Sequence, residues 1–149
     1  MKQENFDGLK IENQLCFPLY VCSKEIIRKY KPLLDTINLT YTQYITMMVI
    51  WEKKETNVKE LGKFLFLDSG TLTPVLKKLE LKGYISRNRA KDDERNLNIE
   101  ITPKGLDLKK RAKNIPEKIG KCLNLREDEA IQLYKIMNKL LSNFKENQN

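Results

Sequence analysis

The sequence predicts a mostly α-helical chain with one small β-hairpin near its middle. Over most of the 149 residues, apolar side chains recur every three or four positions, which is the period of an amphipathic helix. Between residues 84 and 102 the period changes to two, which is typical of strands. The chain has the length of one average domain, and 40% of its residues are hydrophobic. We therefore expect a single folded unit without linkers or repeats.

The first helix is expected over residues 11–31. Pro18 falls inside this range, and proline fits the first turn of a helix but kinks its interior. The regular helix therefore either starts near Pro18 or bends there. We interpret Cys22 as a core position because it lies on the apolar stripe. That stripe comprises Ile11, Leu15, Leu19, Cys22, Ile26 and Leu33.

Three shorter helices are expected next, and each has a start signal. Thr40 with Gln43 and Asn57 with Glu60 have the spacing of capping boxes. A turn at residues 68–70 precedes the third helix, which a glycine at position 83 ends. The expected core side chains are Tyr44, Met47, Met48 and Trp51 on the first, Val58, Leu61 and Leu65 on the second, and Leu72, Val75, Leu76 and Leu79 on the third.

Two strands, residues 84–89 and 96–102, can pair around a polar tip at residues 90–95. Thr102 and Pro103 then open a helix as its N-cap and first residue, and Asn124 with Glu127 caps the last helix. The last helix carries an apolar seam with 4-3-4-3 spacing, which is typical of packing against a partner helix. The seam comprises Ala130, Tyr134, Met137, Leu141 and Phe144.

This order of elements is that of a winged helix-turn-helix, here over residues 40–102, whose second short helix reads the DNA major groove. Short hydroxyl side chains there can bond phosphates or base edges, and an arginine at the wing tip can enter the minor groove. The alternatives are helix capping for the hydroxyls and a solvated face for the basic side chains. The candidate DNA-binding residues are Ser69, Thr71, Thr73, Pro74, Lys77, Arg87, Arg89, Lys91 and Arg95. One acid at positions 92–94 is expected to pair with Arg95 and orient it.

Composition limits the remaining functions. Lys and Arg number 28 and Asp and Glu 20, so the net charge is +8, which suits a polyanionic partner such as nucleic acid. The absence of histidine excludes histidine-dependent catalysis and His-ligated zinc, and the three cysteines form no C-x-x-C pair. We expect no metal, no cofactor and no membrane association. We expect a cytoplasmic protein whose cysteines are free thiols at rest.

Residues 67–80, LDSGTLTPVLKKLE, followed by Asp93-Glu-Arg95, resemble the MarR family of winged-helix regulators. The segments ENQLCF (12–17), YKPLL (30–34) and LTYTQY (39–44) are similar to the OhrR branch, whose members are repressors that sense organic hydroperoxides through one N-terminal cysteine. The resemblance covers roughly residues 10–142. It implies a dimeric MarR-like transcriptional repressor rather than an enzyme, with double-stranded operator DNA as its partner.

The resemblance further implies that Cys16 is the sensing thiol and that Tyr30 and Tyr41 are the phenols that hydrogen-bond its sulfur. Cys122 is the candidate resolving cysteine, and a small thiol is the alternative. A helix N-terminus stabilises a thiolate, and a thiolate reacts with a peroxide to give sulfenic acid. The ordinary alternative for Cys16 is a small buried hydrophobe. Pro18 departs from the pattern expected beside the reactive cysteine and leaves the placement of the phenols open.

The spacing of Cys16 and Tyr30 predicts an assembly. Tyr30 is 14 residues after Cys16, which is about 21 Å along a straight helix. Contact therefore requires a second copy, with the first helices of two protomers crossing antiparallel. We expect a homodimer formed by helices within about 10–36 and 103–146 of a single 1–149 unit, on a near-palindromic operator.

Three other functions remain open at this point. The same regulator can respond to a non-covalent phenolic or other small ligand, which a Cys16→Ser variant would distinguish from a thiol switch. The chain can be a thiol peroxidase, which peroxide turnover with a thiol reductant would detect. It can also be a protein that only heterodimerises with another regulator.

Overall fold

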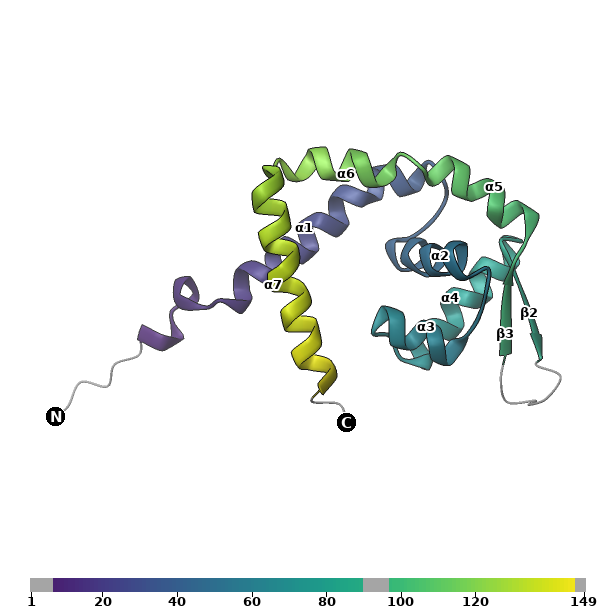
Figure 1. The fold of residues 1–149 in the computed structure, drawn as a ribbon, viewed down its shortest axis with the longest axis horizontal. Helices are drawn as coiled ribbons and strands as arrows, with labels where there is room; N and C mark the ends of the chain where they lie inside the picture. The colour runs from purple at the N-terminus through teal and green to yellow at the C-terminus, as the bar shows by residue number, and fades with distance from the viewer. Residues whose placement is uncertain (1–6, 90–96, 147–149) are drawn as a thin grey trace. The chain divides into compact units, whose positions relative to one another are not determined.

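The computed structural model describes residues 7–89 and 97–146, and it is mostly helical with a small antiparallel sheet, as predicted (Figure 1). The chain divides into two compact units, Met1–Ile115 and Pro116–Asn149. The first unit contains the short 3₁₀ turns η1 (Asp7–Leu9) and η2 (Ile11–Asn13), the helices α1 (Cys16–Asp35), α2 (Tyr41–Lys53), α3 (Val58–Leu65), α4 (Ser69–Leu81) and α5 (Pro103–Ala112), and the strands β1 (Glu55–Asn57), β2 (Ile85–Arg89) and β3 (Leu97–Ile101).

The helix α1 begins at Cys16, so Pro18 lies in its first turn. The first of the two alternatives for Pro18 is therefore correct, because a proline in the first turn removes no intrahelical hydrogen bond. Ile11 belongs to η2 instead of α1. After Asp35 the chain turns through Asn38, whose φ of 54° lies in the left-handed region.

Local capping starts the next three helices. The predicted box at Thr40 is present, since its hydroxyl accepts from Gln43 N and the Gln43 side chain accepts from Thr40 N. Asn57 accepts from the backbone N–H of Glu60. Gly83, with φ of 75°, follows the end of α4 as predicted, because glycine takes the left-handed conformation without a Cβ penalty.

These helices bury most of the predicted core side chains. Met48 is the exception, because it lies on the solvent side of α2 with 44% of its surface exposed. Val58, Leu65 and Val75 are only half-buried. The core of the first unit is formed by Leu34, Ile37, Leu39, Tyr44, Met47, Ile50, Trp51, Leu61, Leu72, Leu76, Leu79, Ile85, Ile99 and Leu108.

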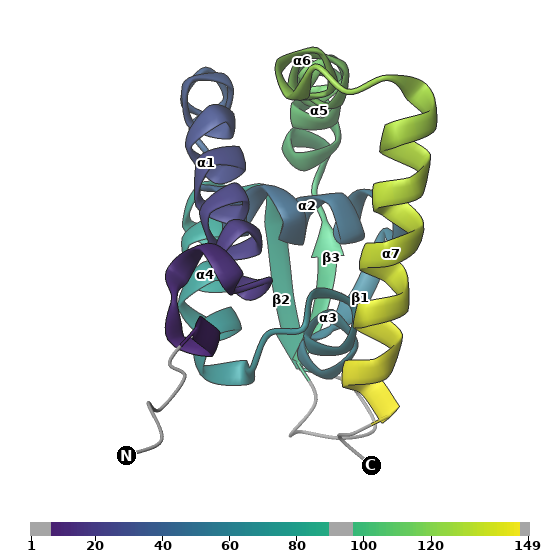
Figure 2. The same ribbon diagram turned by 90° about the vertical axis from the view of Figure 1, so that its left-hand side faces the viewer.

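The sheet has the strand order β1-β3-β2, with both pairs antiparallel (Figure 2). The predicted hairpin is confirmed, and Ile85 lies opposite Ile101 in its register. The strand β1 was not predicted, since three residues, Glu-Thr-Asn, are too few to show a period. Thr56 of β1 lies opposite Ile99 and is buried.

The entry into α5 joins the sheet to α2. Thr102 caps α5 by accepting from Gly105 N, and its hydroxyl donates to Gly83 O. The Trp51 indole N–H donates to Gly105 O over 2.9 Å. A Cβ at position 105 would lie 2.2 Å from Tyr84 O, so only glycine allows this close approach.

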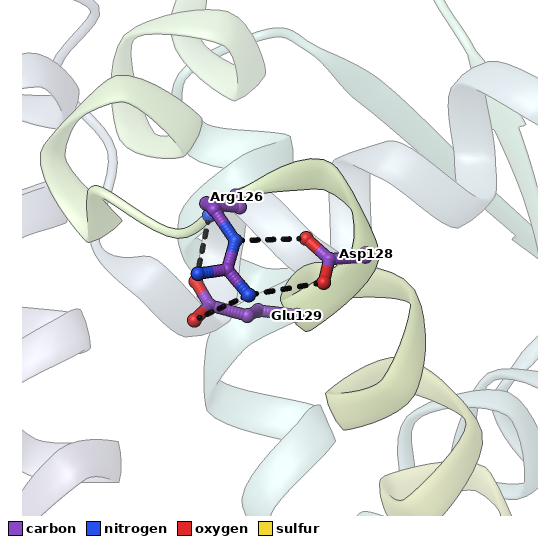
Figure 3. A network of polar contacts seen from close by, with 3 residues as sticks. All are labelled: Arg126, Asp128 and Glu129. Carbon is purple, nitrogen blue, oxygen red and sulfur yellow. Dashed lines mark hydrogen bonds and ion pairs between the residues drawn. The ribbon is translucent and has the colours of Figure 1, made fainter.

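The second unit contains most of α6 (Ile115–Leu123) and all of α7 (Glu127–Glu146). The predicted cap at Asn124 is wrong. Asn124 has φ of 50° and lies after the end of α6, and α7 starts three residues later, where Arg126 N donates to Glu129 Oε2. The Arg126 guanidinium also pairs with Asp128 and Glu129 (Figure 3). These acids lie in the first turn, where the helix dipole favours negative charge.

Candidate DNA-reading surface and thiol site

The N-terminus of α4 is capped by Asp68. One carboxylate oxygen accepts from Thr71 N at 2.7 Å and the other from the Thr71 hydroxyl at 3.1 Å. These two hydrogen bonds hold the pKa of Asp68 below its usual range. Asp68, and not one of the hydroxyl residues, is thus the N-cap of α4. The Asp-x-x-Thr spacing is the sequence signal that could have shown this cap.

The predicted reading residues of α4 are exposed. The Thr73 hydroxyl donates to Ser69 O at 2.7 Å. The hydroxyl groups of Thr71 and Thr73 therefore both donate to acceptors at the start of α4. Their oxygen atoms can still accept hydrogen bonds. The exposed side chains on this part of α4 are Ser69, Thr71, Thr73, Pro74 and Lys77.

On the predicted wing, the structure gives Arg87 a partner within the chain. Its Nε donates to Glu80 Oε2 at 2.9 Å, and the ion pair is only partly exposed. Arg87 lies opposite Ile99 in the ladder, on the face that meets α4. The guanidinium beside Glu80 holds the pKa of that carboxyl below its usual range. Arg89 ends β2 opposite Leu97, whereas Lys91, Arg95 and the acids at 92–94 lie outside the described residues.

Cys16 is exposed and is the first residue of α1. The residue before it, Leu15, provides no side-chain cap to the helix, so it leaves the first backbone N–H groups of α1 without a side-chain acceptor from that position. Leu15 is itself 79% exposed. The first predicted helix, expected over residues 11–31, therefore begins at Cys16.

The two predicted phenols come together in the first unit. The rings of Tyr30 and Tyr41 lie 5.0 Å apart between centroids, and Tyr44 lies 5.8 Å from Tyr30. Burial raises the pKa of all three phenols, and for Tyr30 and Tyr44 neighbouring tyrosines add to the rise. They are neutral hydrogen-bond donors at neutral pH. Tyr44 was predicted only as a core residue, although its three-residue spacing from Tyr41 places the two rings on neighbouring turns.

Cys16 and Tyr30 lie on the same helix, α1. Their separation of 14 residues is therefore about 21 Å of helix length. A hydrogen bond between these two residues of one chain is excluded while α1 stays helical.

The other two cysteines are also exposed. The prediction that Cys22 is a core residue is wrong for the single chain, because the stripe on which it lies is largely uncovered. Cys122, the candidate resolving cysteine, lies on α6. Among the residues that the structure describes, no cluster of three acidic, cysteine or histidine side chains is arranged to hold a metal ion.

A cavity of about 260 Å³ lies between α1 and the start of α2. Its walls are mainly apolar, and the exposed ion pair between Lys31 and Asp35, 2.9 Å long, is part of its lining. Tyr41 connects the cavity to the tyrosine cluster. The lining residues are Ile27, Arg28, Lys31, Leu34, Asp35, Leu39, Thr40 and Tyr41.

Comparison with known proteins identifies the family. A family model described as transcriptional regulator SarA/Rot matches residues 28–112. The chain belongs to this family. It is 44% identical over 138 residues to the organic hydroperoxide resistance transcriptional regulator of Bacillus subtilis, covering 93% of this chain and 92% of that protein. It is 52% identical over 123 residues to the regulator SarZ of Staphylococcus saprophyticus, covering 83% and 84% of the two chains.

Solved structures agree with this assignment. A structure of reduced AbfR bound to DNA is 32% identical, with a TM-score of 0.79 and complete coverage of both chains. A structure of disulfide-formed AbfR is 31% identical, with a TM-score of 0.63 and coverage of 94% and 93%. The resemblance to winged-helix regulators of the hydroperoxide-sensing branch is confirmed, and the chain is a transcriptional regulator and not an enzyme.

Within residues 7–89 and 97–146, none of the helices has the length and apolar character needed to cross a bilayer.

Proposed function

We propose that this regulator is a homodimeric repressor that leaves its DNA operator when an organic hydroperoxide oxidises Cys16. The observation that carries the proposal is the layout of α1. An exposed thiol lies at one end of the helix and the tyrosine cluster near the other, so that two antiparallel copies of α1 would bring each thiol to the phenols of its partner. The hydroperoxide-resistance regulator at 44% identity supports the choice of oxidant.

The DNA-binding part of the proposal rests on residues 40–102. In a winged helix, α4 enters the major groove and the hairpin tip reaches the minor groove. The exposed hydroxyls of α4 supply base-edge contacts, and Lys77, Arg89, Lys91 and Arg95 supply cations. Arg87 supports the wing through Glu80. The structure of reduced AbfR bound to DNA, with a similar fold along the whole chain, supports DNA as the partner of this chain.

The dimer would be formed by helices within residues 10–36 and 103–146. Apolar side chains on α1 and α7 are exposed in the single chain, among them Phe17, Tyr20, Tyr134 and Phe144. Exposed apolar surface of this extent marks an interaction site. A two-fold axis would place the two α4 helices on half-sites of a near-palindrome, about one helical turn or 10–10.5 base pairs apart.

In the proposed oxidation of Cys16, two electrons pass from the sulfur to the peroxide. The Cys16 thiolate attacks one peroxide oxygen, the O–O bond breaks, and the alkoxide leaves and takes up a proton as the alcohol. Sulfur is oxidised to sulfenic acid and the peroxide is reduced. Tyr30 and Tyr41 of the partner subunit would donate to the sulfur before the reaction, since neutral phenols are donors.

Cys122 of the partner subunit is the proposed resolving thiol. Its sulfur would attack the sulfenic sulfur, an S–S bond would form, and water would leave. A disulfide needs Cα atoms within about 7 Å, so closing it would move the chain around Cys122 and turn the two α4 helices out of register with the major grooves. The disulfide-formed AbfR structure supports this route, and a small cellular thiol is the alternative.

Serine variants test the proposal. Cys16→Ser is expected to bind the operator like wild type and to show no release by an organic hydroperoxide. Cys122→Ser is expected to give no cross-linked dimer on a non-reducing gel. Cys22→Ser is the matched control, because this exposed cysteine lies on the same helix and should leave binding and release unchanged. Full peroxide release of Cys16→Ser would contradict the thiol switch.

A non-covalent ligand is the second candidate signal, and the cavity between α1 and α2 favours it. Its mainly apolar wall, to which Tyr41 contributes, suits a small aromatic molecule. A ligand of this kind would weaken operator binding equally in wild type and Cys16→Ser. The two signals are therefore separated by the same variant.

A further inference from the structure

The α1–α2 turn, residues 36–40, is held by basic side chains from two other helices. Lys82, at the C-terminal end of α4, donates from Nζ to Asn38 O at 2.6 Å and to Gln43 Oε1 at 3.0 Å. Arg111 of α5 donates to Thr36 O at 2.8 Å. Carbonyl groups just after a helix are electron-rich acceptors that favour cations. The turn is thus attached to α4 as well as to α1 and α2.

The Gln43 side chain connects the Lys82 contact to the start of α2. Its Oε1 also accepts from Thr40 N, as part of the capping box, and the residue is 3% exposed. This one oxygen therefore accepts hydrogen bonds from both the backbone N–H of Thr40 and the ammonium of Lys82. Tyr41, the first residue of α2, contacts Tyr30 of α1 directly after this cap.

The ammonium of Lys82 is partly buried, and burial lowers its pKa, with a smaller effect from Lys78. A partly buried cation must keep its acceptors, because leaving a charge unpaired away from water is costly. If Asn38 or the cap of α2 moves, the end of α4 must follow or lose these hydrogen bonds.

We propose that Lys82 is a positioning residue that fixes the orientation of the reading helix α4 relative to α1 through the α1–α2 turn. The inference rests on the proposed function, in which α1 belongs to the dimer interface and α4 reads DNA. In that dimer, Lys82 limits how far the distance and angle between the two α4 helices can change, and so limits binding to one spacing of the operator half-sites. It acts through Asn38 and Gln43 and makes no base contact.

The ratio of affinities for operators with different half-site spacings is a quantity that a loss of protein stability alone would not change. One base pair inserted between the half-sites turns one of them by about 35°. Wild type is expected to bind the lengthened operator about tenfold more weakly, the size of one mismatched base pair. In Lys82→Met the two α4 helices can adjust, so the difference between the operators should fall to about twofold or less.

Lys78→Met is the matched control, because it removes an exposed lysine from the same helix about one turn earlier. It should keep the wild-type preference for the shorter operator. If Lys82→Met weakens binding to both operators equally and lowers the salt dependence by about one counterion, Lys82 is a phosphate contact and the proposal is wrong. Unchanged discrimination in Lys82→Met would also overturn it. A wild type that binds neither operator would refute the proposed function instead.

Amide hydrogen exchange of the free protein tests the same contact without DNA. Lys82→Met should exchange several-fold faster over residues 37–43 than wild type, because the turn and the cap of α2 lose a shared donor. Lys78→Met should match wild type there. Equal exchange in all three proteins would overturn the positioning role even if no operator is bound.

Discussion

The region from α2 to α5 and the pair of helices α1 and α7 differ in where their apolar side chains are covered. In the first region Met47, Ile50, Leu61 and Leu72 are fully buried within the chain, and every helix start has a side-chain cap. On α7, Tyr134 is 72% and Phe144 57% exposed. The first of these, the reading region (residues 41–112), is thus specified by its own sequence, whereas α1 and α7 carry apolar side chains that are exposed in the single chain.

This difference separates two kinds of mutation. A change in the buried core of the reading region should alter folding at any protein concentration, because the affected contacts lie inside one chain. A change on the exposed seam should act through assembly and so depend on concentration.

The largest effect is expected from a charge on the seam. Leu141→Glu would bury a carboxylate in each half of the proposed dimer, and burying leucine is itself worth about 1.5–3 kcal/mol per copy. We expect a monomer at micromolar concentration and a loss of operator affinity of about a hundredfold or more. Sedimentation and gel shift measure both. Gln132→Glu adds the same charge elsewhere on α7 and should leave the dimer intact; a monomeric wild type would end the dimer proposal.

Next in size is an added methyl group where α2, the sheet and α5 meet. In Gly105→Ala the new Cβ would meet Tyr84 O at 2.2 Å, and overpacking of this kind costs about 3 kcal/mol. The loss of unfolding free energy should be the same at every protein concentration. Gly120→Ala is the control, because a Cβ there meets nothing within 4 Å and alanine favours the helix. Equal stability of the two variants would show that the sheet can move away from α5.

The wing is expected to contribute less than the seam to operator affinity. Arg95→Ala should weaken binding by about 1–3 kcal/mol if the side chain enters the minor groove. Thr71→Ala or Thr73→Ala should change sequence preference more than salt dependence. Competition gel shifts over a range of salt concentrations measure these effects, with Lys110→Ala on α5 as control. Wild-type affinity of Arg95→Ala would mean that the wing does not read DNA.

Much of the reading region was predictable because its signals are local. The box at Thr40, the cap at Thr102 and the glycine at position 83 act on neighbouring residues, and the alternation of strand β3 needs only five positions. The wrong cap at Asn124 has the same origin, since a short polar side chain suits a left-handed residue after a helix as well as an N-cap.

Long-range pairings were not predictable in this way. Nothing near Arg87 in the sequence shows that its guanidinium meets Glu80 across the end of α4, or that Lys82 reaches Asn38. Cys22 was assigned to a core because a helical stripe predicts burial without saying whether the covering surface belongs to the same chain. Cys16, Tyr30 and Tyr41 were identified as candidate site residues by resemblance, and their roles stay predictions.

The smallest expected effect concerns the ion pair inside the reading region. The hydrogen bond from Arg87 lowers the pKa of Glu80, so the unfolded chain binds a proton more readily than the folded one. The stabilisation is therefore present above the unfolded value of about 4.3 and is lost as the pH falls through the folded pKa. Because the pair is partly exposed, it should contribute below about 1 kcal/mol. Thermal melts of wild type and Glu80→Gln should differ most at pH 7 and converge below about pH 4, whereas Glu117→Gln, whose ion pair with Lys121 is exposed, should match wild type throughout. A difference that persists at low pH would mean that Glu80 acts by packing and not by its charge.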